Sequence, residues 1–113
     1  MIAHLVLRVA DIEVSRRFYS MLGLEFVTEK HGAGPTHYAC EIGSTVLELY
    51  PQGRHPKSFV RLGIEVESAS ESAAALRAAG WGDCAQFEEM SRRVTVTDPD
   101  GNEIDLVERE RVG

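Results

Sequence analysis

Residues 45–51, TVLELYP, recur 57 positions later as residues 102–108, NEIDLVE. In each copy an acidic residue, Glu48 or Asp105, interrupts an apolar run that is typical of a strand. The same offset aligns further pairs of similar residues: Val9 with Val66, Gly23 with Gly80, Leu47 with Ile104, and Leu49 with Leu106. An offset that holds from residue 4 to residue 106 predicts two copies of one supersecondary unit.

The hydrophobic periodicity predicts the order β-α-β-β-β in each copy. In the first copy we expect strands at 3–9, 24–29, 36–42 and 45–50 and a helix at 11–22; in the second, strands at 59–66, 85–89, 92–97 and 102–107 and a helix at 68–79. The polar, proline-containing stretch 51–58, PQGRHPKS, reads as a linker between modules 1–50 and 59–113. Each copy is too small to bury its own apolar faces well, so the two should form one compact domain.

The fold class expected from this order is α+β, with two βαβββ modules whose mixed sheets curve around a shared cleft. One alternative is a dimeric α+β barrel of ferredoxin-like type. It would need only two strands after each helix, so 24–29 or 36–42 would have to be a loop.

The charge and hydropathy of the chain limit its partners. The 113 residues carry a net charge of −6. Nucleic acids and anionic membranes both attract basic surfaces, so neither is an expected partner. No apolar run approaches the roughly 20 residues of a membrane span, and no signal peptide is visible. A cytoplasmic protein is the default expectation.

Strand alternation predicts which side chains face away from the helices. His4, Val6 and Arg8 should share that face in the first strand, and Glu48 and Tyr50 in the last strand of the first copy. The same reasoning adds His37 and Glu41 from the neighbouring strand, and Arg61, Glu65, Glu103 and Asp105 from the second copy. Charged side chains are rarely buried unless they are paired or bound to a ligand. This polar face therefore either lines a solvent-filled cleft or holds charges that pair with each other or with a metal.

Three stretches carry a resemblance to a known family: HLVLRVADIEVSRRFYSMLGLEF at 4–26, TVLELYP at 45–51, and TDPDGNEIDL at 97–106. They resemble the vicinal oxygen chelate superfamily, which includes glyoxalase I, bleomycin-resistance and fosfomycin-resistance proteins and extradiol dioxygenases. The resemblance covers essentially the whole chain. It implies a small-molecule site between the modules, and it implies a homodimer.

In metal-using members of that family the ligands come from the first and last strands of both modules. By position, the corresponding residues are His4, Glu48, Arg61 and Asp105. His4 and Glu48 match what the family uses, and Asp105 is a shorter carboxylate. Arg61 departs from the pattern, because a guanidinium has no lone pair to offer a cation.

Two interpretations follow from the resemblance. In the first, His4, Glu48 and Asp105 hold Mn²⁺, Fe²⁺ or Mg²⁺. Glu48 and Asp105 are then the candidate catalytic residues of a lyase, isomerase or dioxygenase, because a free carboxylate can act as the base on a vicinal-dioxygen substrate. His37 is a candidate additional ligand.

In the second interpretation Arg61 replaces the metal and neutralises Glu48 and Asp105. The cleft then binds a small organic molecule without chelation, with His37, Arg61, Arg8 and Tyr50 as ligand-binding residues. We favour this interpretation, because a fixed cation within a few ångströms of a divalent ion costs several kcal/mol even at an effective dielectric near 20. His31 and His55 are expected to be surface residues of loops, and Trp81 has no assignable role.

Overall fold

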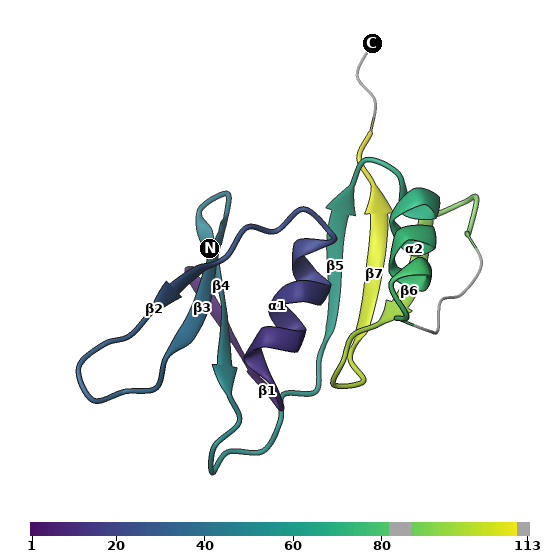
Figure 1. The fold of residues 1–113 in the computed structure, drawn as a ribbon. Helices are drawn as coiled ribbons and strands as arrows, with labels where there is room; N and C mark the ends of the chain where they lie inside the picture. Colours follow the sequence, from purple (N-terminus) through teal and green to yellow (C-terminus); the bar gives the residue numbers. More distant parts are fainter. Residues whose placement is uncertain (82–86, 111–113) are drawn as a thin grey trace. The chain divides into compact units, whose positions relative to one another are not determined.

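A computed structural model describes residues 1–81 and 87–110 (Figure 1). The chain divides into two compact units, Met1–Ser58 and Phe59–Gly113, and each is described by itself. The first unit contains β1 (His4–Val9), α1 (Ile12–Ser20), β2 (Val27–Glu29), β3 (His37–Ile42) and β4 (Thr45–Pro51). Its four strands form one mixed sheet in the order β1-β4-β3-β2. The expected α+β class and the β-α-β-β-β order of this module are confirmed.

Helix α1 begins where the sequence predicts a cap. The Asp11 carboxylate accepts hydrogen bonds from the backbone N–H groups of Glu13 and Val14, at 2.9 and 3.2 Å. These bonds satisfy amides that have no partner inside the helix. After α1, Gly23 adopts a φ of 90°, a conformation that favours glycine over residues with a Cβ.

The core of the first unit lies between α1 and the sheet. Leu7 and Val9 of β1, Leu49 of β4 and Phe18 of α1 are each at most 2% exposed. Helix α1 packs against β3 and β4, so alternate residues of these strands lie on the opposite face of the sheet. The face assignment that the sequence predicts is therefore confirmed for these residues.

Strand β2 is shorter than the predicted strand at 24–29. The backbone N–H of Leu24 still donates to the Tyr19 carbonyl, at 3.3 Å, so the chain is tied to the end of α1 at this point. Pairing with β3 starts only at Val27, opposite Ala39. The hairpin that follows matches its prediction: Ile42 pairs with Thr45 across Gly43 and Ser44, and Ala39 pairs with Glu48.

The second unit contains β5 (Arg61–Val66), α2 (Ala69–Ala78), β6 (Arg93–Thr97) and β7 (Glu103–Glu108). Its three strands form a sheet in the order β5-β7-β6, and α2 packs over β6 and β7. Residues 85 and 86 of the strand predicted at 85–89 lie outside the described residues, and in the remainder Glu88 forms an isolated bridge with Arg93. Trp81 follows α2, and its backbone N–H donates to the Leu76 carbonyl at 2.9 Å.

The duplication extends to the strand register. His4 pairs with Val46 in the parallel β1–β4 ladder, and Arg61 pairs with Glu103 in the parallel β5–β7 ladder. Arg61 lies 57 positions after His4, and Glu103 lies 57 positions after Val46, so the two pairs are equivalent. Each half therefore builds the same parallel strand pair, with an acidic residue at the same place in it.

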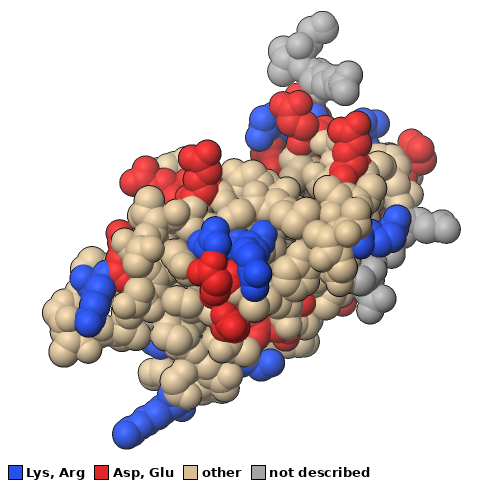
Figure 2. Space-filling model, in the orientation of Figure 1, with Lys and Arg blue, Asp and Glu red and all other residues tan. Residues whose placement is uncertain are grey.

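On the face seen in Figure 2, acidic and basic side chains lie interspersed. Among residues 1–81 and 87–110, no helix has the length and apolar character needed to cross a membrane.

Candidate functional site

The sheet of the first unit has a polar face that points away from α1, which we call the open face. Val6 pairs with Glu48, and Glu48 pairs with Ala39, so residues in register place their side chains on the same side. The open face carries His4, Val6 and Arg8 from β1, His37, Ala39 and Glu41 from β3, and Val46, Glu48 and Tyr50 from β4. Three of the predicted ligand-binding residues, Arg8, His37 and Tyr50, therefore lie on it together with Glu48.

His37 is at the centre of the polar contacts on this face. The residue is 1% exposed, and its Nε2 lies 3.2 Å from Glu48 Oε2 and 3.3 Å from Glu29 Oε1. Its Nδ1 lies 3.2 Å from the Pro35 carbonyl oxygen. Because a carbonyl oxygen can only accept, Nδ1 carries the proton in this contact.

A row of polar and aromatic side chains crosses the open face. The His37 and Tyr50 rings are stacked, with centroids 4.1 Å apart and planes 12° apart. The Arg8 guanidinium lies 4.9 Å from the centre of the Tyr50 ring. Burial, reinforced by the Glu48 carboxylate, raises the pKa of Tyr50 above its usual value. The phenol therefore stays protonated at neutral pH and can donate a hydrogen bond.

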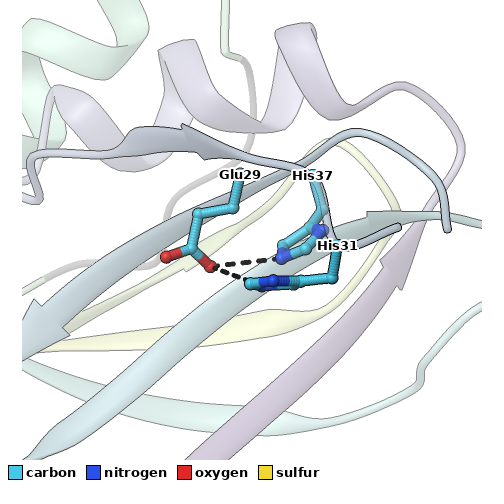
Figure 3. Close-up of side chains that lie close together, drawn as sticks. All are labelled: Glu29, His31 and His37. Carbon is cyan, nitrogen blue, oxygen red and sulfur yellow. Dashed lines mark hydrogen bonds and ion pairs between the residues drawn. The ribbon is translucent and has the colours of Figure 1, made fainter. Parts of the chain in front are cut away.

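Two residues that the sequence reasoning missed complete this row. Figure 3 shows Glu29 and His31 converging on His37, with Glu29 Oε1 between the two rings. The His31 Nε2 lies 3.5 Å from that oxygen, and one donor atom from each of the three residues lies within 4.8 Å of the others. His31 is exposed, as predicted for a loop residue, but it belongs to this cluster.

The signal that would have revealed the cluster is a spacing across the 30–36 loop. Glu29 ends β2, and His37 begins β3 directly opposite it in the antiparallel register. His31 follows Glu29 by two positions, the spacing at which extended residues share a face.

A groove lies on the same face beside β2. Its lining includes the apolar side chains of Val27, Ala39 and Val46 and the carboxylates of Glu29 and Glu41. These residues come from β2, β3 and β4, with Glu41 and Val46 paired directly across the hairpin. The groove can therefore contact both an apolar and a polar part of a small molecule.

In the second unit the corresponding position is occupied by Asp105, which is 8% exposed. Arg61 donates to both of its oxygens, from Nε at 2.9 Å and from a terminal nitrogen at 3.0 Å. The Thr95 hydroxyl donates to Asp105 Oδ1 at 2.6 Å. Arg61, followed by Thr95, holds the pKa of Asp105 below its usual value, so the carboxylate stays ionised.

Of the four positions that the family resemblance assigns to a metal, Arg61 cannot ligate a cation and it pairs with Asp105. Arg61 offers no lone pair, and its bidentate contact uses both oxygens of Asp105. His4 lies at the exposed first position of β1, and Glu48 contacts His37. That Glu48 and Asp105 project into one shared cleft stays a prediction.

The fold of this chain is similar to the folds of several solved structures. The chain resembles an antibiotic binding protein from Streptomyces sp. CB03234, with 20% identity and a TM-score of 0.78 over 97% of this chain and 96% of that one. It resembles the trypanothione-dependent glyoxalase I of Leishmania major, with 28% identity and a TM-score of 0.74 over 96% and 86%. It also resembles a glyoxalase/bleomycin resistance protein from the same Streptomyces strain, with 22% identity and a TM-score of 0.73 over 95% and 99%.

A search of curated protein sequences found no match. The family model for the glyoxalase, bleomycin resistance protein and dioxygenase superfamily matches residues 1–106, which include both copies of the repeat and both acidic strand positions. The chain therefore belongs to the Glyoxalase/Bleomycin resistance protein/Dioxygenase superfamily.

Proposed function

We propose that this protein binds a small organic molecule in a cleft between its two modules, without a metal at the family positions His4, Glu48, Arg61 and Asp105. The observation that carries the proposal is the bidentate contact of Arg61 with Asp105. A guanidinium fixed there supplies the positive charge that a metal would otherwise bring. It would also repel a divalent ion placed a few ångströms away. Within this proposal the protein is a cytoplasmic homodimer.

The groove of the open face supports a ligand with both an apolar and a basic part. Val27, Ala39 and Val46 offer apolar contacts, and Glu29 and Glu41 offer carboxylates. The net charge of −6 would favour the approach of a cationic ligand. The Streptomyces protein with the same fold is described as binding an antibiotic, which supports the same class of function here.

The test is a ligand titration followed by amide NMR. We would add aromatic, amine-bearing antibiotics to protein held in a chelator. We expect shifts at Glu48 of the open face and at Thr95, which contacts Asp105 in the second unit, and unchanged signals in α1 and α2. Shifts confined to the helices would contradict the proposal.

A matched pair of variants locates the binding. Val46→Trp places a bulky ring in the groove from a half-buried position. We expect it to weaken binding at least tenfold, while Ala74→Trp on an exposed position of α2 leaves binding unchanged. Equal binding by both variants would argue against a site in the groove.

A second candidate is a metal-dependent lyase, isomerase or dioxygenase. The 28% identity to the Leishmania major glyoxalase I favours it. In that case His4, Glu48 and Asp105 hold Mn²⁺, Fe²⁺ or Mg²⁺. Loading the protein with Mn²⁺ should then give turnover of catechols or diketones, and both turnover and bound Mn²⁺ should be lost in His4→Ala and in Asp105→Asn.

A further inference from the structure

We propose that Glu29, His31 and His37 form a divalent transition-metal site on the β2–β3 hairpin. All three residues lie in the first unit, and none of them is among the family metal positions His4, Glu48, Arg61 and Asp105. The proposal does not rest on the ligand-binding function above, because it needs neither the second module nor Arg61, although Glu29 also lines the groove and His37 is also a candidate ligand-binding residue. Figure 3 shows the three side chains pointing toward one another.

The distances within the cluster match those between ligands of one metal ion. Zinc–ligand bonds of about 2.0–2.1 Å in a tetrahedron put neighbouring ligand atoms about 3.3–3.4 Å apart. Glu29 Oε1 lies 3.3 Å from His37 Nε2 and 3.5 Å from His31 Nε2. Ion-paired N–H···O contacts are shorter, about 2.7–2.9 Å. The contacts of Glu29 with the two rings are long for direct pairing, although the one with His37 is a hydrogen bond, and they fit an ion held among the three residues.

The orientation of the His37 ring points to the same conclusion. Its Nδ1 donates to the Pro35 carbonyl, the arrangement in which a histidine presents Nε2 as a ligand atom. Nε2 faces two carboxylate oxygens, from Glu29 and Glu48. In this orientation Nε2 is directed at both carboxylates, so a cation placed there would contact all three groups.

The hairpin holds the ligands in place before a metal binds. Glu29 and His37 are paired in the antiparallel register, and the His37 ring is stacked on Tyr50. The His31 side chain is 73% exposed, which gives an ion access from solvent. Glu48 Oε2, 3.2 Å from His37 Nε2, is placed to complete the site. Two imidazoles with one or two carboxylates suit Zn²⁺ or Co²⁺.

The experiment is a titration of untagged, metal-free protein with Co²⁺ and Zn²⁺. We expect one ion per chain, a visible Co²⁺ spectrum of low coordination number that Zn²⁺ abolishes, and a change in the ring ¹⁵N signals of His31 and His37. No binding, or binding without a change in those ring signals, would overturn the proposal.

The variants separate this site from the family positions. His31→Ala changes an exposed loop residue and should leave the fold intact, so we expect at least a tenfold loss of Zn²⁺ affinity with unchanged amide spectra. The matched control His55→Ala, in another exposed loop, should bind as the wild type does. Unchanged affinity in His31→Ala would overturn the proposal, and so would a loss in His4→Ala that His31→Ala does not show. The ligand titration described above is read out in chelator, so its failure would not affect this result.

Discussion

The ionised state of the Asp105 carboxylate depends mainly on one neighbour, Arg61. Arg61 contacts both carboxylate oxygens and holds the pKa of Asp105 below its usual value. The folded form thus favours the ionised carboxylate, which adds stability at pH values above about 4, the usual pKa in the unfolded chain. That stability is lost as the pH falls through the lower pKa of the folded state.

We predict that Asp105→Asn lowers the free energy of unfolding by about 1–2 kcal/mol at pH 7, because a charge-assisted bidentate contact becomes a neutral one. Urea denaturation measured from pH 7 down to pH 2 would show the difference from wild type shrinking below about pH 4. The matched control is Glu103→Gln. The Glu103 carboxylate also contacts Arg61, at 3.0 Å, but it is 56% exposed. We therefore expect Glu103→Gln to lower the free energy of unfolding by less than about 0.5 kcal/mol. A difference between Asp105→Asn and wild type that grows toward acid pH would contradict this assignment.

Single residues also show which parts of the site the sequence could predict. That Arg61 cannot ligate a metal follows from its chemistry, and its pairing with an acidic neighbour on the same face follows from strand alternation. The two-residue spacing of His31 from Glu29 predicts its contribution only if the chain stays extended beyond β2. Whether it does depends on the path by which the 30–36 loop returns the chain to β3, and loop paths are not fixed by hydrophobic periodicity.

At the scale of elements, the N-terminal caps of the two helices can be compared directly. Asp11 accepts two backbone hydrogen bonds at the start of α1, and Ser68 accepts one, from Glu71, at the start of α2. We predict that Asp11→Ala and Ser68→Ala each cost about 1 kcal/mol, with the larger loss for Asp11, whose charge also interacts favourably with the helix N-terminus. Urea denaturation of both variants measures the costs, and Asp11→Asn, which keeps an acceptor, serves as the control. A larger loss for Ser68→Ala would contradict this ranking.

The sequence predicts the boundaries of helices and strands where residues close in the chain determine them. Asp11, Gly23 and the Gly43–Ser44 turn mark their boundaries through backbone chemistry that neighbouring residues alone determine. The predicted strand at 24–29 was too long because Leu24 remains bonded to Tyr19, a contact set by how the end of α1 is capped. Strand pairing, which is not local, decides where β2 begins.

At the scale of the whole molecule, we predict from the duplication that the acidic positions of the two modules serve one site. Glu48 and Asp105 occupy equivalent places in two parallel ladders of identical register. If they meet in one cleft, Arg61 is what keeps a family-type metal out, since it neutralises Asp105 and offers no lone pair. Replacing that guanidinium by an imidazole would then release Asp105 from its bidentate contact and add a ligand.

We therefore predict that Arg61→His creates a Mn²⁺ or Zn²⁺ site that binds at least tenfold more tightly than the same chain with arginine. The measurement is a calorimetric titration carried out in a His31→Ala background, which removes the proposed hairpin site. Adding Glu48→Gln should abolish the gain, because that substitution removes a carboxylate contributed by the other module, whereas Glu65→Gln, on a neighbouring position of β5, should not. A gain that survives Glu48→Gln would mean that the new ion is held within the second module alone, and no gain at all would mean that Glu48 and Asp105 do not share a cleft.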